Sequence, residues 1–325
     1  MIVGVVLAQA SASGLTKLVN TLWDGFALGA LYALLALGFV IIFKATQVVN
    51  FAHGAIASVG AYFVATFAVE KHIPGRWTPG PRWLDWSLSV LLALIAAAII
   101  GLLIERLTIR PMIGEPLFSV AIITLGLDIV LRSLVNDFLG TSNKSMGSPF
   151  GLKVLRIGDI RIPHTQIVST LLAFAAFAAV GIFFKSRMGV AMRSTAFDQE
   201  AALCQGIKVG RVFALAWAIG AVLATLAGTF AAIFPRGSGN LEAGTAFFAL
   251  RAFPAVILGG LDSVKGAIVG GFLVGTIEIV TSVYLQSHRD VLGNGFQTVV
   301  PYVVMLVGLL IRPYGLFGTV EVRRV

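Results

Sequence analysis

Ionisable residues inside apolar stretches are the first candidates for chemistry, because each charge costs on the order of 3 kcal/mol at the centre of a membrane. Asp128 and Arg132 are four residues apart, which places both on one face of a helix, and we expect an intrahelical ion pair. Glu278 has no close partner in the sequence. We expect it to face an aqueous cavity or to meet Arg251 or Lys265, so Glu278 and Arg251 are candidate pathway or gate residues.

A second candidate region is the segment NFAHGAIASVGAY, from Asn50 to Tyr62. The Asn50 side chain can accept a hydrogen bond from a backbone N–H two or three positions on, so the sequence predicts a helix that starts at Asn50. His53 is then expected in the first turn, near the membrane surface. The positive end of a helix suits an anionic group, so Asn50, Phe51 and His53 are candidate pathway or gate residues. The alternative is a capped helix whose small residues serve packing alone.

The most polar internal stretch covers about residues 186–210 and contains the letters EAALCQGI. Its candidate functional residues are Glu200, Ala201, Ala202, Gly206 and Ile207. The first two residues start a short amphipathic helical turn, Ala202 leaves room for a partner surface, and Gly206 ends the turn as a C-cap. Taken alone, the pattern also fits any short cytoplasmic helix with a glycine stop.

Catalytic motifs are not evident in the sequence. The alternative to a non-catalytic protein is an intramembrane protease in which Asp128 and Asp262 form a carboxylate pair that activates water. Neither lies in a Gly-x-Gly-Asp setting, and the chain contains no HExxH and no GxxxxGK[ST] phosphate loop. The single cysteine, Cys204, excludes an intramolecular disulfide framework and a multi-cysteine metal site. We therefore expect no catalytic residue, no metal site and no nucleotide bound by this chain.

Composition shows the setting in which these residues must be placed. Of 325 residues, 24 are basic and 15 acidic, so 12% are charged, while 58% are hydrophobic and the mean hydropathy is +0.93. Soluble domains carry about 25% charged residues, so a soluble enzyme is excluded and we expect an all-α polytopic membrane protein. The net charge of +9 fits loops retained in the cytoplasm. Nucleic acid is not expected as a partner, because no basic cluster is interleaved with aromatic residues.

The apolar segments predict eight or nine transmembrane helices, including broken or re-entrant segments, in one domain over residues 1–325. Spans are expected near 21–43, 50–69, 87–104, 117–136, 166–184, 212–233, 245–260, 264–286 and 295–312. In the segment 245–260, Arg251 and Pro254 interrupt the apolar run, so a half-helix fits as well as a full span. Small residues four apart, such as Gly25 with Gly29, predict faces of close helix packing.

Nine crossings place the N-terminus outside and the C-terminus in the cytoplasm. The charge bias that supports this orientation is weak over all loops and improves when only short connections are counted. We interpret the first residues as a periplasmic tail or interfacial segment, with a cleaved signal peptide as the alternative.

Several stretches, in register, resemble one family. EAALCQGI, preceded by GVAMRSTAFD, resembles the EAA coupling loop of ABC importer permeases. Five further stretches from about residue 21 to 318 resemble, in order, the high-affinity branched-chain amino acid permease family: GALYALLALGFVIIF, VVNFAHGAIASVGAY, AIITLGLDIVL, FPAVILGGLDSVKGAIVGGFLVG and RPYGLFG. Members of this type pair with a second, homologous permease.

The resemblance implies a permease subunit in the bacterial inner membrane, within an ATP-driven importer of leucine, isoleucine and valine or related small amino acids. The implied partners are a second homologous permease, two cytoplasmic ATP-binding subunits, an external substrate-binding protein and membrane lipid. ATP and Mg²⁺ belong to the ATP-binding subunits, so no cofactor is expected in this chain. The coupling loop, with Glu200, Ala201, Ala202 and Gly206, is implied to dock on the ATP-binding subunit and to transmit its closure.

Two alternatives stay open at this point. Members of the family often carry an acidic residue after NFAHG, whereas Ala55 follows Gly54 here, so the same importer class carrying urea or short amides is one alternative. A stand-alone secondary carrier or channel is the other, since broken spans and charges within the membrane suit that class equally well. The EAALCQGI loop argues against it, because a lone carrier has no ATPase to receive the loop.

Overall fold

Helices make up most of the protein in the computed structural model. The structure describes residues 14–77, 80–139, 143–151, 153–234, 240–241, 247–288, 290, 293 and 295–319. The long helices are α2 (Gly14–Thr46), α4 (Arg82–Ile104), α5 (Leu117–Leu134), α6 (His164–Lys185), α9 (Val209–Ile233) and α11 (Val264–Tyr284). The shorter ones are α3 (His53–Ala65), α7 (Arg187–Phe197), α8 (Gln199–Cys204), α10 (Phe248–Gly259) and α13 (Phe296–Ile311).

Short turns and strands complete the described structure. The π-helical turns are η1 (Thr66–Glu70), η2 (Glu105–Ile109) and η4 (Val135–Leu139), and the 3-10 turns are η3 (Arg110–Met112) and η6 (Gln286–His288). The strands are β1 (Lys144–Ser145), β2 (Val154–Ile157), β3 (Ile160–Pro163) and β4 (Asn240–Leu241). β1 pairs antiparallel with β4, and β2 pairs antiparallel with β3.

Six helical segments in the described part are long and apolar enough to cross a membrane. They are Gly14–Thr46, Arg82–Met112, Phe118–Asp137, His164–Lys185, Val209–Ile233 and Val264–Tyr284. The all-helical prediction is therefore confirmed, whereas the predicted count of eight or nine spans is not reached by length alone. The remaining predicted spans correspond to α3, α10 and α13, which are too short by themselves to cover a bilayer core of about 30 Å.

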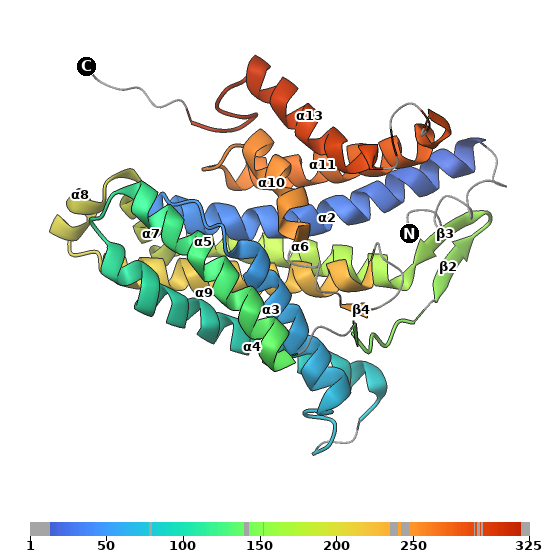
Figure 1. Cartoon of the computed structure of the whole chain (residues 1–325), viewed down its shortest axis with the longest axis horizontal. Helices are drawn as coiled ribbons and strands as arrows, with labels where there is room; N and C mark the ends of the chain where they lie inside the picture. The colour runs from blue at the N-terminus through green and yellow to red at the C-terminus, as the bar shows by residue number, and fades with distance from the viewer. Residues whose placement is uncertain are drawn as a thin grey trace.

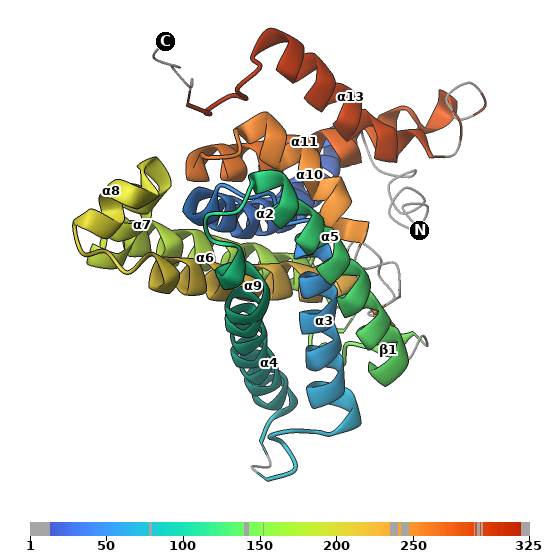
Figure 2. The same cartoon turned by 60° about the vertical axis from the view of Figure 1, so that its left-hand side comes forward.

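Helix α2 is the centre of the bundle. Helices α6, α9, α10 and α11 pack around it, and the 18-residue window of α2 that is its candidate span is 89% buried. Figure 1 shows α2, α6, α9 and α11 running along the long axis, with α3, α4 and α5 inclined across them. In the turned view of Figure 2, α3 and α4 project away from the central helices. A span that is almost wholly buried needs no lipid-facing surface of its own.

Glycines allow the backbones of α2 and α11 to touch. A Cβ atom added at Gly29 would lie 2.7 Å from Cα of Phe272, and one added at Gly275 would lie 2.4 Å from Cα of Gly29. A Cβ added at Gly271 would lie 2.4 Å from Cα of Ala33. The prediction that small residues four apart mark packing faces is confirmed for this helix pair.

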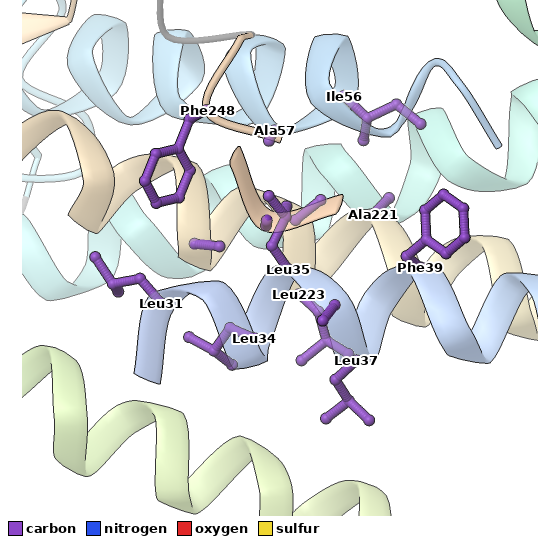
Figure 3. Packing of buried hydrophobic residues seen from close by; sticks show 14 of the residues in the cluster. Leu31, Leu34, Leu35, Leu37, Phe39, Ile56, Ala57, Ala221, Leu223 and Phe248 are labelled. Carbon is purple, nitrogen blue, oxygen red and sulfur yellow. The ribbon is translucent and has the colours of Figure 1, made fainter. Parts of the chain in front are cut away.

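Apolar side chains from four helices fill the space beside α2. Figure 3 shows part of this cluster, including Leu35 of α2, Ile56 of α3, Leu223 of α9 and Phe248 of α10. Each of these side chains is less than 10% exposed. The cluster brings the first turns of α3 and α10 against the middle of α2, which sets the position of the candidate site.

Helix α3 begins deep in the bundle, which corrects the prediction for this segment. It starts at His53 rather than at Asn50, and its N-cap residue, Ala52, makes no side-chain cap bond. His53 is 3% exposed, and its Nε2 lies 3.1 Å from the carbonyl oxygen of Leu35. Leu35 is roughly three turns, about 16 Å, from the end of α2 at Thr46. The chain after Thr46 therefore returns into the bundle as a non-helical segment before α3 starts.

The two ends of the bundle carry different structures. Figure 1 shows the β2–β3 hairpin at one end, beside the start of α2, and α7 with α8 at the other. The backbone N–H of Arg161 in β3 donates to Oδ1 of Asn20 in α2, at a distance of 3.1 Å. Helix α7 contacts α2, α6 and α9. The predicted polar loop therefore lies at the end opposite to the hairpin.

Candidate functional site

Glu278 lies at a junction of α2, α10 and α11. Its Oε2 accepts a 2.6 Å hydrogen bond from the hydroxyl of Tyr32, and its Oε1 lies 4.0 Å from Nη1 of Arg251. Glu278 is 2% exposed, whereas the Arg251 side chain is 41% exposed. Of the two expected partners, the structure places Arg251, not Lys265, beside the carboxylate. A buried charge thus has one hydrogen bond and one counter-charge that reaches the surface.

Helix α10 accounts for the interrupted segment at 245–260. It has twelve residues, from Phe248 to Gly259, and contains Pro254. Proline lacks an N–H, so the carbonyl of Leu250, four residues earlier, loses its helical partner. The hydroxyl of Tyr302 in α13 donates to that carbonyl oxygen at 2.7 Å. The half-helix therefore tolerates its proline because a neighbouring helix supplies the missing donor.

The C-terminal segment RPYGLFG closes the other end of α10. The backbone N–H groups of Leu316 and Phe317 donate to the carbonyl oxygens of Leu258 and Gly259, at 2.8 and 3.0 Å. Gly260 has φ +106, which the chain needs to leave the helix at this point. This motif thus satisfies helix-terminal carbonyls that have no partner within α10.

A small cavity separates the starts of α3 and α10. Its volume is about 80 Å³, and it is lined by α2, by α10 and by the segment that holds Asn50, Phe51 and His53. Binding pockets for small molecules usually measure roughly 300–1,000 Å³, so this cavity is too small for an amino acid. Oδ1 of Asn50 accepts from the N–H of Ala52 at 3.1 Å, so Asn50 stabilises the turn before α3.

A polar stripe on α5 faces the non-helical segment and the start of α10. Thr124, Asp128 and Arg132 are spaced at i, i+4 and i+8. Oγ1 of Thr124 accepts from the N–H of Phe51 at 3.2 Å, and Nε of Arg132 lies 2.8 Å from Oδ2 of Asp128. The Arg132 guanidinium lies 4.4 Å from the ring centroid of Phe247. The stripe therefore connects the region before α3 to the region before α10.

These residues form one partly exposed surface, which we name the α5–α10 face. It comprises Phe51, Asp128, Arg132, Phe247, Leu250 and Arg251. Phe51 and Leu250 line the same cavity and are 41% and 51% exposed. The face combines both signs of charge with apolar side chains. The sequence predicted the charged residues and Phe51 as candidates. Phe247 and Leu250 were not predicted, because they resemble ordinary apolar span residues.

The residues of EAALCQGI form the short helix α8 and its glycine stop. Oδ1 of Asp198 accepts from the N–H of Ala201 at 2.9 Å and caps the start. At the end, the N–H of Gly206 donates to Leu203 and that of Ile207 donates to Ala202, at 2.9 and 3.0 Å. Gly206 has φ +78, so these bonds form a Schellman motif. The prediction that Gly206 ends the helix is confirmed, with Gln205 as the C-cap residue just before it.

The exposed surface of the α7–α8 segment differs from the predicted one. Ala202 is 3% exposed and packs inward, so its methyl group does not leave room for a partner. Glu200 and Ala201 are exposed, and Leu203 is 55% exposed. Phe197, at the junction of α7 and α8, is 94% exposed. Phe197 was not predicted as a candidate, although an aromatic residue in the most polar loop of the sequence indicates an exposed contact for a partner.

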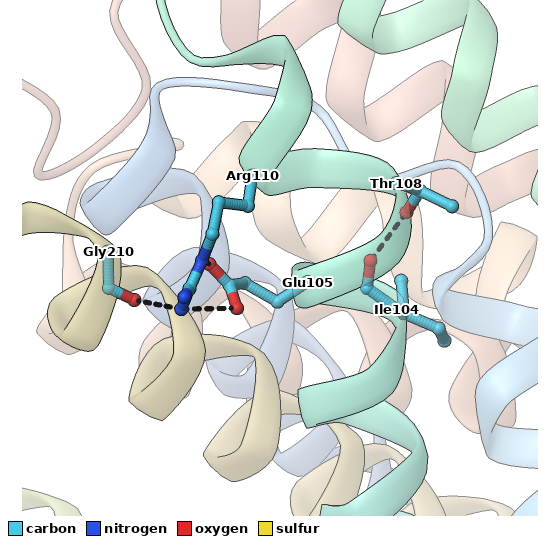
Figure 4. Close-up of polar contacts among 5 residues, drawn as sticks. All are labelled: Ile104, Glu105, Thr108, Arg110 and Gly210. Carbon is cyan, nitrogen blue, oxygen red and sulfur yellow. Dashed lines mark hydrogen bonds and ion pairs between the residues drawn. The ribbon is translucent and has the colours of Figure 1, made fainter.

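An ion pair between a buried glutamate and an exposed arginine fixes the chain beside this segment. Nε and Nη2 of Arg110 donate to the two carboxylate oxygens of Glu105, each at 3.0 Å, and Nη2 also donates to the carbonyl oxygen of Gly210 at 3.1 Å. Figure 4 shows this bridge from the end of α4 to the start of α9. The two residues are five apart and flank the π-helical turn η2, in which such positions share a face.

The two carboxylates considered for catalysis have separate partners. Asp128 pairs with Arg132, as described above. The side chain of Asp262 accepts from the N–H and the hydroxyl of Thr319, and its backbone oxygen accepts from Nζ of Lys44 at 2.9 Å. The described residues contain no hydrogen bond between the two aspartates, so the structure gives no geometric support to the protease alternative.

Long apolar helices around a buried central helix, with half-helices at their core, define a multi-pass membrane transport protein. A family model described as branched-chain amino acid transport system / permease component matches residues 21–310. The chain therefore belongs to the branched-chain amino acid transport permease family.

Two relatives with 30% and 31% sequence identity agree with this assignment. The high-affinity branched-chain amino acid transport system permease protein LivH of Escherichia coli K12 is 31% identical over 313 residues, covering 94% of this chain and 97% of the relative. The corresponding protein BraD of Pseudomonas aeruginosa is 30% identical and covers 96% and 98%. A solved structure, PsaBC from Streptococcus pneumoniae in complex with Fab, has a TM-score of 0.44 at 14% identity and covers 98% of both chains.

Proposed function

We propose that this chain is the permease subunit of an ATP-driven importer of leucine, isoleucine, valine or related small amino acids. The observation that carries the proposal is the combination of family membership with the exposed α7–α8 segment, which ends in EAALCQGI. The relatives named above are branched-chain amino acid permeases, which supports this substrate class. ATP hydrolysis is assigned to two cytoplasmic ATP-binding subunits, and substrate delivery to an external binding protein.

The arrangement of the helices supports an orientation for the chain. With the α7–α8 segment in the cytoplasm, α2 begins outside and the β2–β3 hairpin lies outside, at the opposite end of the bundle (Figure 1). Nine crossings then connect the ends of the chain, if α3 with η1, α10 and α13 are counted with the six long spans. In this scheme, the non-helical segment before α3 supplements that half-helix.

The α5–α10 face is assigned to the translocation pathway, opposite a second permease. A free amino acid carries an ammonium and a carboxylate, and a branched-chain one adds an apolar side chain. The face offers Arg251 and Arg132 to the carboxylate, Asp128 to the ammonium, and Phe51 and Leu250 to the side chain. Urea and short amides are uncharged, so they do not need both signs of charge. This difference favours an amino acid over the amide alternative.

The α7–α8 segment is assigned to the ATP-binding subunit, with Phe197 and Glu200 as its main contacts. Phe197 is 94% exposed, so its ring is in contact with water, at a cost in free energy, unless a partner covers it. Glu200 is exposed in the first turn of α8 and is free to pair with a basic residue. Because Asp198 and Gly206 cap α8 at both ends, these contacts are held on a defined helix rather than on a loose loop.

The test is to co-express the chain with its neighbouring genes, purify the complex through a tag in mild detergent, and measure both ATP hydrolysis and labelled leucine uptake in vesicles. We expect Phe197→Asp and Glu200→Arg to insert normally and to lose leucine uptake. Trp77→Asp is the matched control, because Trp77 is 71% exposed at the opposite end of the bundle. Purification of the chain without any ATP-binding subunit, or wild-type uptake by Phe197→Asp, would refute the coupling assignment.

The substrate class has its own test. The wild-type complex is reconstituted with the binding protein, and uptake of labelled leucine is compared with uptake of labelled urea. We expect uptake of leucine that requires ATP. Uptake of urea alone would reject the amino-acid assignment while leaving the importer class in place.

A further inference from the structure

A long apolar groove lies on the side of the bundle away from the α5–α10 face. Its floor is α9, and its walls are α4 and α6. The volume is about 690 Å³, within the usual range of roughly 300–1,000 Å³ for small-molecule sites. Alanines at Ala98, Ala175, Ala176 and Ala179 make the groove deep where larger side chains would fill it. No described residue of another element covers it.

The length of the groove argues for an acyl chain. Its α4 wall extends from Trp86 to Ala98, about 18 Å at 1.5 Å per residue, and its α6 wall from Leu172 to Phe183, about 17 Å. These lengths are close to half of the hydrocarbon core of about 30 Å, the part of a bilayer that one acyl chain occupies. A transmembrane helix of a partner would extend across the whole hydrocarbon core, about twice the length of this groove.

A polar pocket adjoins the groove at Trp86. Its volume is about 400 Å³, and Trp86 lines both spaces. Arg82 and Asp85 line the pocket from the first turn of α4, His72 lines it from the preceding loop, and Ser145 lines it from β1. Two neighbouring tryptophans, Trp77 and Trp83, are 71% and 59% exposed. Such exposed tryptophans are typical of the head-group level of a membrane, so the pocket lies where lipid head groups lie.

The two charged side chains of the pocket do not pair with described residues of the chain. Within the described residues, the buried Oδ1 of Asp85 accepts no hydrogen bond, and neither Asp85 nor Arg82 forms an ion pair. Two charges on neighbouring elements, Lys144 and Glu70, pair with each other at 2.6 Å. A buried carboxylate oxygen without a donor is costly unless a ligand supplies one.

We propose that the pocket and groove together bind one zwitterionic phospholipid, with the phosphate at Arg82, the ammonium at Asp85 and one acyl chain in the groove. A guanidinium matches a phosphate, and an acidic side chain matches an ammonium group. Phosphatidylglycerol carries the same phosphate but a neutral glycerol in place of the ammonium, so it leaves the Asp85 carboxylate without a counter-charge. The site is separate from the α5–α10 face, so the proposal does not depend on the transported substrate.

The test uses the purified full-length chain in its complex. The complex is stripped of lipid by extended detergent washing, then titrated with phosphatidylethanolamine or phosphatidylglycerol, and bound lipid is counted by native mass spectrometry. We expect one phosphatidylethanolamine per chain, bound about tenfold more tightly than phosphatidylglycerol, a difference of about 1.4 kcal/mol. Equal retention of the two lipids, or tighter binding of phosphatidylglycerol, would overturn the assignment of a zwitterionic head group.

Variants locate the site. Ala179→Trp fills the groove and Asp85→Asn removes the carboxylate charge, and we expect each to weaken phosphatidylethanolamine binding by about tenfold or more. Ile182→Trp is the matched control for the first variant, since Ile182 is 70% exposed on α6 and does not line the groove. Thermal unfolding of each variant shows that it is folded. A photoactivatable phosphatidylethanolamine with its reactive group in the acyl chain should label α4, α6 or α9.

Three outcomes would reject the site itself. The first is unchanged phosphatidylethanolamine binding by Ala179→Trp. The second is cross-linking confined to other helices. The third is a structure of the complex in which a helix of another subunit covers the groove.

Discussion

Tyr32 and Glu278 are 246 residues apart in the chain, yet they share a 2.6 Å hydrogen bond between α2 and α11. The two helices approach through Gly29, Gly271 and Gly275, so their separation leaves room for a hydroxyl and a carboxylate in direct contact. Because the carboxylate is buried, the hydroxyl supplies a partner that water cannot. The hydrogen bond therefore fixes which face of α2 is turned toward α11.

Tyr32→Phe should lower the free energy of unfolding by about 1–3 kcal/mol, because it removes the donor and leaves a buried acceptor less satisfied. Thermal unfolding of the purified chain in detergent measures the effect. Tyr62→Phe is the matched control, since the Tyr62 hydroxyl is also buried but has no hydrogen-bond partner in the described structure. Equal midpoints for the two variants would show that the Tyr32 hydroxyl contributes nothing.

Arg110→Lys should also destabilise the chain, by about 1–3 kcal/mol, because an ammonium cannot reach both oxygens of Glu105 and the carbonyl of Gly210 together. The Glu105 side chain is 1% exposed, so water does not replace the lost bonds. Arg106→Lys is the control, because Arg106 is exposed on the same turn. Proteolysis rates at the α8 to α9 connection provide a local measurement. Equal rates in the two variants would contradict a role for the bridge.

Gly271→Ala tests the backbone contact of α2 and α11. The added Cβ would lie 2.4 Å from backbone atoms of Ala33, which cannot rotate away, so a loss of about 1–3 kcal/mol or failure to accumulate is expected. Gly181→Ala, on α6, is the control, because an added Cβ there meets nothing within 4 Å. Folded yield and unfolding temperature are measured for both. A Gly271→Ala protein as stable as Gly181→Ala would show that the helices can separate without cost.

Arg251→Gln tests the α5–α10 face. If Arg251 meets the substrate carboxylate, uptake of leucine should fall by roughly tenfold or more at limiting substrate, since a charge-assisted hydrogen bond is lost. Lys265→Gln is the control, because Lys265 is exposed at the start of α11 and does not contact Glu278. Basal ATP hydrolysis should persist in both variants. Unchanged uptake by Arg251→Gln would remove Arg251 from the pathway.

Local patterns in the sequence predicted local structure well. The spacing of Asp128 and Arg132 indicated a contact on one helix, and Gly206 indicated a helix stop, because both depend only on residues a turn away. Small residues four apart indicated packing faces. They did not indicate which helices would meet, because a glycine face carries no information about its partner.

The interior of the site could not be predicted in the same way. The predicted bond to the Asn50 side chain, from the N–H two positions on, is present, but the helix starts only at His53. The depth of this start depends on the carbonyl of Leu35 and on Thr124, which are remote in sequence. Tyr302 shows the same limitation: its partner is a carbonyl freed by a proline in another helix. The pair Glu105 and Arg110 was missed because five-residue spacing indicates a contact only on a π-helical turn.

The burial of α2 has a consequence for the way the protein is made. This helix precedes every helix that covers it, so at the ribosome it emerges before α6, α9, α10 and α11 exist. At roughly 5–20 residues per second, Tyr32 is synthesised about 10 to 50 s before Glu278. During that interval the glycine face and the hydroxyl of α2 must be shielded by lipid or by the insertion machinery. The most protected helix of the finished protein is therefore the one that spends the longest time uncovered during its synthesis.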